Sequence, residues 1–329
     1  MMRAATYTGK GGTEVIAVRD DVPEPEVGTD DALVEVAFAG LNRADVLERQ
    51  GNYPVLHRGA FTIPGMEFSG IVRATGSRVT SVSAGDRVCG LVPTGAHAEL
   101  LSTNALTLSK VPEDVTLRDA AAIPEAFITA HDALVTRADF KLGEFVLVHA
   151  VGSSVGLAAV ALVKRGGGVT IGTSRTADKL ARARAHGLDF GFLLDDGWRA
   201  KVQVATNSRG PDVVLDFVGA PMLDENLGVL AQGGRIVQIG SMGGTQAHLH
   251  LGLLMSKRAA LHGTVLRTRP IDEKIALAKH FERALLPLFE RGELRAEVDF
   301  VFSLEQLAAA HEYMESNANF GKIVIEVAG

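Results

Sequence analysis

The chain has 329 residues, of which 47% are hydrophobic and 22% charged, and its formal net charge is −6. This length predicts about two domains, and the acidic balance argues against a broad basic surface for nucleic acid or an anionic membrane. The single cysteine, Cys89, excludes an intrachain disulfide and favours a reducing compartment, so we expect a cytoplasmic protein. No apolar run approaches the roughly 20 residues of a membrane span, and the first residues, MMRAATYTGK, lack the apolar core of a signal peptide.

The N-terminal part of the chain alternates short strand patterns with turn signals. The segments that read as strands are MRAATYT, TEVIAVRD, ALVEVAFAG, EFSGIVRATG and GDRVCGLV. One helical pattern interrupts them at residues 42–50, NRADVLERQ. These patterns predict a β-rich N-terminal domain.

From about residue 145 the chain alternates strand and helix patterns. Strands are expected at 145–150, 169–173, 212–219 and 235–240, with helices between them. Such an order predicts a parallel, doubly wound sheet. The C-terminal part carries one long amphipathic helix at 271–291, a second at 303–317, and a closing strand, KIVIEV.

The first strand of this alternation leads into the segment VLVHAVGSSVGLAAV, residues 146–160. A GxGxxG pattern is absent, because Gly152 and Gly156 stand four residues apart with Ser153 and Ser154 between them. Small side chains at a helix N-terminus still let the backbone approach a pyrophosphate, and the serines add hydroxyl donors. We therefore expect a dinucleotide to contact residues 152–155 (Gly152, Ser153, Ser154 and Val155); a purely structural tight turn is the alternative.

The second strand indicates which dinucleotide binds. NAD sites carry an Asp or Glu about 20 residues beyond the glycines, to bind the ribose 2′-hydroxyl. Here the strand ends Gly172-Thr173-Ser174-Arg175 without a carboxylate, and Lys179 follows. Ser174, Arg175 and Lys179 can pair with a 2′-phosphate through charge-assisted hydrogen bonds. The pattern predicts NADP (NADPH), with a solvated basic helix face as the alternative.

Motifs along the whole chain carry a family resemblance. In order they are GLNRADVLERQGNYP, IPGMEFSGIV, GDRV, AAAIPEAFITA, HAVGSSVG, MSKRAALHGTVLRTR and ANFGKIVIEV. The chain resembles the zinc-free quinone oxidoreductases of the medium-chain dehydrogenase/reductase superfamily, relatives of zeta-crystallin. NRAD and AAIPEA look most like the subgroup of the tumour-suppressor-induced quinone oxidoreductase of mammals.

The resemblance implies a fold and an assembly. It implies a GroES-like, β-rich catalytic domain (1–123 with 267–329) and a Rossmann dinucleotide-binding domain (124–266). It also implies a homodimer formed through the edge of the Rossmann sheet, for which the strand-like segment LHGTVL (261–266) is the candidate.

The resemblance also implies site residues. Those expected on the nicotinamide side are Tyr53, Thr129, Val218, Ser241, Met242, Leu266 and Asn319. Asn42 faces the nicotinamide and the substrate in relatives, so Asn42 and Tyr53 are the candidate catalytic residues, able to hydrogen-bond an acceptor carbonyl. The chain departs from the family where Ser153 replaces the middle glycine of AxxGxxG. It departs again at Leu194, which replaces a tyrosine near the 2′-phosphate.

We expect no metal. Met66, in GMEFSG, stands where the zinc dehydrogenases have a histidine ligand. His248 and His250 alternate as on one face of a strand, but no cysteine or acidic cluster accompanies them. Without a Lewis acid, the favoured reaction is hydride transfer from NADPH to a quinone or a similar electron-poor small molecule. An enone or alkenal reductase, and a non-catalytic NADPH-binding protein, remain alternatives.

Overall fold

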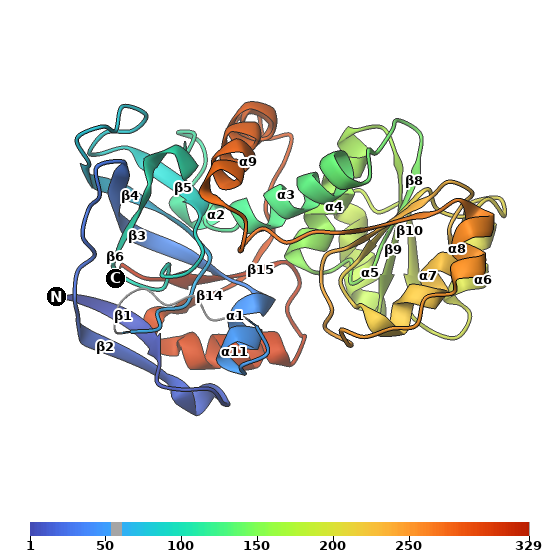
Figure 1. Cartoon of the computed structure of the whole chain (residues 1–329), viewed down its shortest axis with the longest axis horizontal. Helices are drawn as coiled ribbons and strands as arrows, with labels where there is room; N and C mark the ends of the chain where they lie inside the picture. The colour runs from blue at the N-terminus through green and yellow to red at the C-terminus, as the bar shows by residue number, and fades with distance from the viewer. Residues whose placement is uncertain (54–60, 329) are drawn as a thin grey trace. The chain divides into compact units, whose positions relative to one another are not determined.

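The computed structural model describes residues 1–53 and 61–328. The chain divides into two compact units (Figure 1): the first unit is residues 1–128 with 266–329, and the second unit is residues 129–265. The chain passes from the first unit to the second within α3 (Pro124–His131). Over the described ranges, no helix is both long enough and apolar enough to cross a membrane.

The first unit is β-rich, as the strand patterns predict, and it is built on a mixed sheet. Its strand order is β14-β15-β3-β4-β5-β7, with β6 also paired to β3, while β1 and β2 form a separate antiparallel pair. The bounds are β1 Met2–Tyr7, β2 Ile16–Val22, β3 Asp31–Leu41, β4 Glu67–Thr75, β5 Arg87–Leu91, β6 Leu100–Asn104, β7 Leu108–Lys110, β14 Val298–Ser303 and β15 Lys322–Glu326. The last strand of the chain thus pairs with β3, from the N-terminal part.

Helices α1, α2, α9, α10 and α11 complete the first unit. Their bounds are α1 Arg43–Arg49, α2 Leu117–Ala120, α9 Ile271–Ala284, α10 Leu286–Glu290 and α11 Leu307–Glu315. Helix α11 lays Leu307, Ala310 and Met314 against the sheet core; their three- and four-residue spacing places them on one helix face. The expected single helix over 271–291 is wrong, because the chain breaks at Leu285. Pro287 has no N–H to continue the helical hydrogen bonds there.

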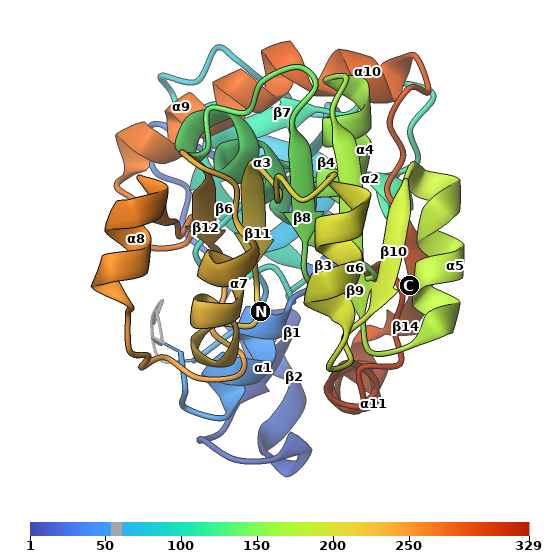
Figure 2. The same ribbon diagram turned by 90° about the vertical axis from the view of Figure 1, so that its right-hand side faces the viewer.

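The second unit holds a six-stranded parallel sheet with the order β10-β9-β8-β11-β12-β13, seen from one side in Figure 2. Its strands are β8 Phe145–Val148, β9 Val169–Ser174, β10 Phe190–Leu193, β11 Val213–Asp216, β12 Arg235–Gln238 and β13 Ala260–Gly263. The predicted doubly wound sheet is confirmed. Strand order reverses between β8 and β11, and sheets of this kind bind ligands at the carboxyl ends of the strands beside such a reversal.

Helices cover both faces of this sheet. Helices α4 (Ser154–Arg165) and α5 (Ala177–Ala183) lie on one face, and α6 (Trp198–Ala205), α7 (Leu223–Val229) and α8 (Leu251–Lys257) lie on the other (Figure 1). The central strands are therefore apolar on both sides. The expected strand around His248 and His250 is wrong: no strand forms there, and the His250 ring accepts a 3.0 Å hydrogen bond from the N–H of Leu253 at the start of α8.

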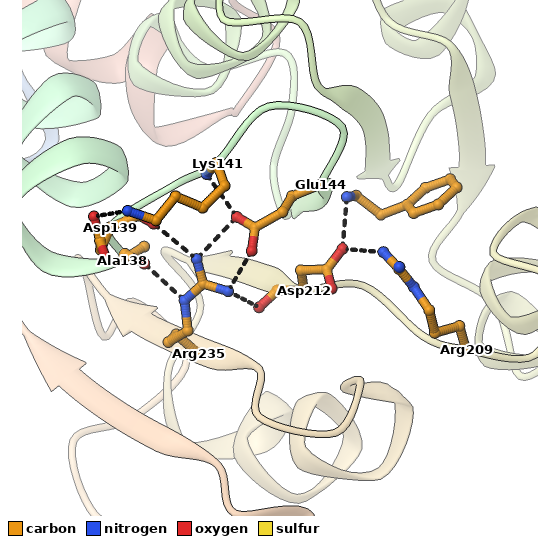
Figure 3. A network of polar contacts seen from close by, with 8 residues as sticks. Ala138, Asp139, Lys141, Glu144, Arg209, Asp212 and Arg235 are labelled. Carbon is orange, nitrogen blue, oxygen red and sulfur yellow. Dashed lines mark hydrogen bonds and ion pairs between the residues drawn. The ribbon is translucent and has the colours of Figure 1, made fainter.

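A polar network fastens the amino ends of the central strands (Figure 3). Arg235 at the start of β12 makes a bidentate pair with Glu144, with distances of 2.8 and 2.9 Å, and donates 2.7 Å to the carbonyl of Ala138. Asp212, just before β11, accepts a 2.9 Å bond from the N–H of Phe145 and one from Arg209. These contacts join the starts of three strands, at the opposite end of the sheet from the loops that carry the candidate site.

Candidate functional site

The loop between β8 and α4 has the backbone of an anion site. Ser153 is the N-cap of α4, and its hydroxyl accepts a 3.1 Å hydrogen bond from the N–H of Gly156. A Cβ on Gly156 would lie 2.8 Å from the carbonyl oxygens of both Ala150 and Val151, so only glycine lets the loop close onto the helix. The small side chains leave the first N–H groups of α4 open to a phosphate.

The end of β9 lies beside this loop. The N–H of Val151 donates 3.1 Å to the carbonyl of Thr173. Ser174 follows, buried, and accepts a 3.2 Å bond from the N–H of Thr176; Arg175 is exposed. Leu194 also reaches this edge, because its N–H donates to the carbonyl of Ser174 at 2.9 Å. Hydroxyl and guanidinium groups at a strand end without a carboxylate suit a 2′-phosphate, so the residues present fit NADP.

Three expected nicotinamide contacts are brought together by the loops after β11 and β12. The N–H of Gly243 donates 2.7 Å to the carbonyl of Val218, which places Ser241 and Met242 beside Val218. Gly219 has φ +93°, and a Cβ there would lie 2.8 Å from the Cα of Ser241. The loops therefore pack backbone to backbone. Thr129, in α3, is buried.

In the first unit, Asn42 belongs to a buried ionic cluster that the sequence motifs do not reveal. Its amide Nδ2 donates 2.9 Å to Glu67 Oε1, and its Oδ1 accepts a 2.8 Å bond from Lys322 Nζ. Lys322 also forms an ion pair with Glu67, and both side chains are at most 1% exposed. Glu67 Oε2 accepts a 2.9 Å bond from the N–H of Glu125. Because Lys322 and Glu67 begin the strands on either side of β3, the fold itself creates the cluster.

Tyr53 is placed by a second buried pair. The Arg267 guanidinium lies 5.3 Å from the centre of the Tyr53 ring, forms an ion pair with Glu48, and donates 2.6 Å to the carbonyl of Pro93. Burial, and then repulsion from Glu125, raises the pKa of Tyr53, so the phenol stays protonated near neutral pH. It can act as a hydrogen-bond donor.

An apolar pocket in the first unit adjoins both groups. Its lining surrounds about 550 Å³ of space between atoms, open solvent included. Leu266, an expected cofactor contact, lines it together with Met66, Ile128 and Phe281. The charged residues of the lining are Glu125, Arg267 and Lys274, of which Arg267 is paired with Glu48. Asn319 lies elsewhere in the unit, beside β15, and donates 3.1 Å to the carbonyl of Gly321.

The side chains around Glu67 do not fit a zinc ion. Lys322 already binds the oxygens of Glu67 and Asn42, and its charge opposes a second cation there. Burial raises the pKa of Cys89 to about 12, helped by the Glu67 carboxylate, so the thiol stays protonated, whereas metals bind the thiolate. Across residues 1–53 and 61–328, no group of three or more His, Cys, Asp or Glu side chains is placed to hold a metal ion.

Known proteins share this architecture. The family model described as "Alcohol dehydrogenase GroES-like domain" matches residues 28–113, and the one described as "Zinc-binding dehydrogenase" matches residues 193–325. The quinone oxidoreductase-like protein 2 of Bos taurus is 33% identical over 95% of this chain and 89% of its own length. The quinone oxidoreductase of Lama guanicoe is 30% identical over 99% and 97%.

A mycobacterial structure solved in complex with NADPH has a TM-score of 0.88 at 27% identity, covering 99% of this chain and all of its own. The resemblance to the quinone oxidoreductases of the medium-chain dehydrogenase/reductase superfamily is confirmed by these relatives, as is the expectation of an oxidoreductase. The chain belongs to the quinone oxidoreductase-like family of the medium-chain dehydrogenase/reductase superfamily.

Proposed function

We propose that the protein is an NADPH-dependent, zinc-independent reductase of quinones and similar electron-poor acceptors. The observation that carries the proposal is the buried Lys322–Glu67–Asn42 cluster. Glu67 of this cluster follows Met66, which stands where the zinc dehydrogenases have a histidine ligand, and the charge of Lys322 opposes a second cation there. Without a metal to stabilise an alkoxide, the favoured acceptor is one that stabilises its own added charge.

The second unit provides the cofactor groups. NADPH, when bound, supplies the hydride. Ser153 and the first turn of α4 would hold the pyrophosphate, and Ser174 with Arg175 the 2′-phosphate, with Lys179 behind them on α5. Val218, Ser241 and Met242 would border the nicotinamide. The mycobacterial relative with NADPH supports this choice of cofactor.

The first unit provides the acceptor groups. The apolar pocket would take the ring and exclude water from it. Two donors are available for the acceptor oxygen. One is the protonated Tyr53 hydroxyl. The other is the Nδ2 group of Asn42, whose contact with the carbonyl of Gly40 is long, at 3.4 Å.

The test is NADPH oxidation by purified protein with 1,4-naphthoquinone, with an enone and with an alkenal, each with and without a strong chelator. The proposal expects chelator-resistant oxidation with the quinone and slower oxidation with the others. Faster turnover of the enone or alkenal than of the quinone would instead identify the protein as an enone or alkenal reductase. Tight NADPH binding without turnover of any acceptor would identify it as a non-catalytic binding protein.

We propose further that the protein works in the cytoplasm as a homodimer. The basis for the location is the free, buried Cys89. The basis for the dimer is strand β13, which forms one edge of the second unit's sheet and carries Leu261, 43% exposed. Leu251 and Met255, on the preceding helix α8, are 62% and 73% exposed. An apolar edge strand needs a cover. Light scattering of the wild type should give twice the mass of one chain, and Leu261→Lys should reduce the measured mass to that of one chain. A monomeric wild type would refute the dimer.

A further inference from the structure

A buried hydrogen-bond network runs beneath the loops of the second unit. Asp216, at the end of β11, accepts a 2.9 Å bond from the Nδ2 of Asn226. The Oδ1 of Asn226 lies 2.6 Å from the Nε2 of His149, and the Nδ1 of His149 lies 2.7 Å from the hydroxyl of Thr173. These four residues are fully buried. The Trp198 ring packs edge-on against the His149 ring, with 5.5 Å between the ring centres.

One carboxylate fixes the direction of every bond in this network. A carboxylate only accepts, so Asn226 must present its NH₂ group to Asp216 and its oxygen to His149. His149 then donates from Nε2 and accepts at Nδ1 from Thr173. Burial lowers the pKa of His149, which keeps the ring in the neutral form that this order requires.

The network joins the end of strand β9 to the loop after β11, and these two segments would hold opposite ends of the cofactor. Thr173 immediately precedes Ser174, at the 2′-phosphate end. At the other end, Asp216 Oδ1 accepts bonds from the N–H groups of Val218 and Gly219, at 2.6 and 3.0 Å. His149 itself starts the phosphate loop, and its N–H donates 3.1 Å to the carbonyl of Leu215.

We propose that Thr173, His149, Asn226 and Asp216 form a positioning network that sets the nicotinamide-side loop against the 2′-phosphate strand end. The inference rests on the proposed NADPH function and adds residues that touch no cofactor themselves. Such a network acts through pre-organisation: it holds distant contacts in one register before the ligand arrives. Severing it at Thr173 should therefore weaken a ligand that spans both ends more than a ligand that occupies one.

The test compares Thr173→Val, which keeps the side-chain shape and removes the hydroxyl, with Thr173→Ser, which keeps the hydroxyl. Dissociation constants are measured by fluorescence for NADPH and by calorimetry for 2′,5′-ADP, which lacks the nicotinamide end. We expect Thr173→Val to weaken the binding of NADPH by about tenfold, equivalent to about 1.4 kcal/mol, and the binding of 2′,5′-ADP by about twofold. Thr173→Ser should stay close to the wild type for both.

The outcomes separate the inference from the function it rests on. Titration of the wild type with NADPH tests the proposed function. The ratio of the dissociation constants of Thr173→Val and Thr173→Ser tests the network. Equal NADPH affinity in the valine and serine variants would overturn the network, and so would an equal loss for both ligands in Thr173→Val. If Thr173→Val does not fold, Thr173→Ala against Thr173→Ser gives the same comparison, with the same expected losses.

Discussion

Replacing Lys322 with methionine removes the cation from the buried cluster of the first unit and leaves Glu67 charged and fully enclosed. The side chains of the pair are 1% and 0% exposed, so water cannot compensate the carboxylate. Breaking a buried pair on one side costs about 3–5 kcal/mol for this reason. Asn42 also loses the 2.8 Å hydrogen bond that Lys322 Nζ donates to its Oδ1. We expect the free energy of unfolding to fall by about 3–5 kcal/mol.

The assay is urea unfolding followed by circular dichroism, with hydrogen exchange of peptides from β3, β4 and β15 to localise the loss. Exchange is needed because the single tryptophan, Trp198, reports on the second unit. Lys110→Met is the matched control: Lys110 pairs with Asp86 but is 54% exposed, so about 1 kcal/mol or less should be lost. The double variant Lys322→Met/Glu67→Gln should recover most of the stability, because no charge stays buried. A loss in Lys322→Met no larger than in Lys110→Met, or no recovery in the double variant, would show that the buried pair does not stabilise the first unit.

Gly156→Ala should raise the NADPH dissociation constant by about tenfold or more, a loss of about 1.4 kcal/mol or more, because its Cβ meets two carbonyl oxygens at 2.8 Å. Its control, Gly228→Ala in α7, has open space around the new methyl and should leave NADPH affinity unchanged. Burial raises the pKa of Asp45 to about 7, so the folded state holds a proton that the unfolded state releases, and stability should fall as pH rises from about 4 to about 7. Asp45→Asn should flatten that slope in unfolding measurements, and an unchanged slope would contradict the assignment. Arg235→Ala should lower the free energy of unfolding by about 1–3 kcal/mol and leave the NADPH dissociation constant within about twofold. A large loss of affinity would contradict a purely structural role for the network of Figure 3.

Local patterns were sufficient to predict the parallel, doubly wound sheet of the second unit. Each of its signals lies within a short stretch of sequence: the apolar run into β8, the small residues before α4, and the end of β9 without a carboxylate. Such signals can be interpreted before the fold is known. Helix α8 was missed because its segment is short and its cap, His250, is not a typical capping residue. The break at Leu285 was missed although Pro287 signals it, because the amphipathic pattern continues across it.

The buried ionic cluster could not be predicted in the same way. Asn42 and Lys322 are 280 residues apart, and they meet only because β15 pairs with β3. In KIVIEV, Lys322 reads as the solvent-facing end of a strand, which is where lysine is normally found. The His149 network is hidden for the same reason: Asn226 joins His149 across 77 residues. Long-range polar contacts need the topology first.

NADPH preference is tested most directly by the affinities of the wild type and of Arg175→Ala for NADPH and for NADH. We expect the wild type to bind NADPH at least about tenfold more tightly than NADH, a difference of about 1.4 kcal/mol or more. Arg175→Ala should remove most of this preference by weakening the binding of NADPH alone. Equal affinity of the wild type for the two cofactors, or an equal loss of affinity for both in the variant, would contradict a 2′-phosphate site at Arg175.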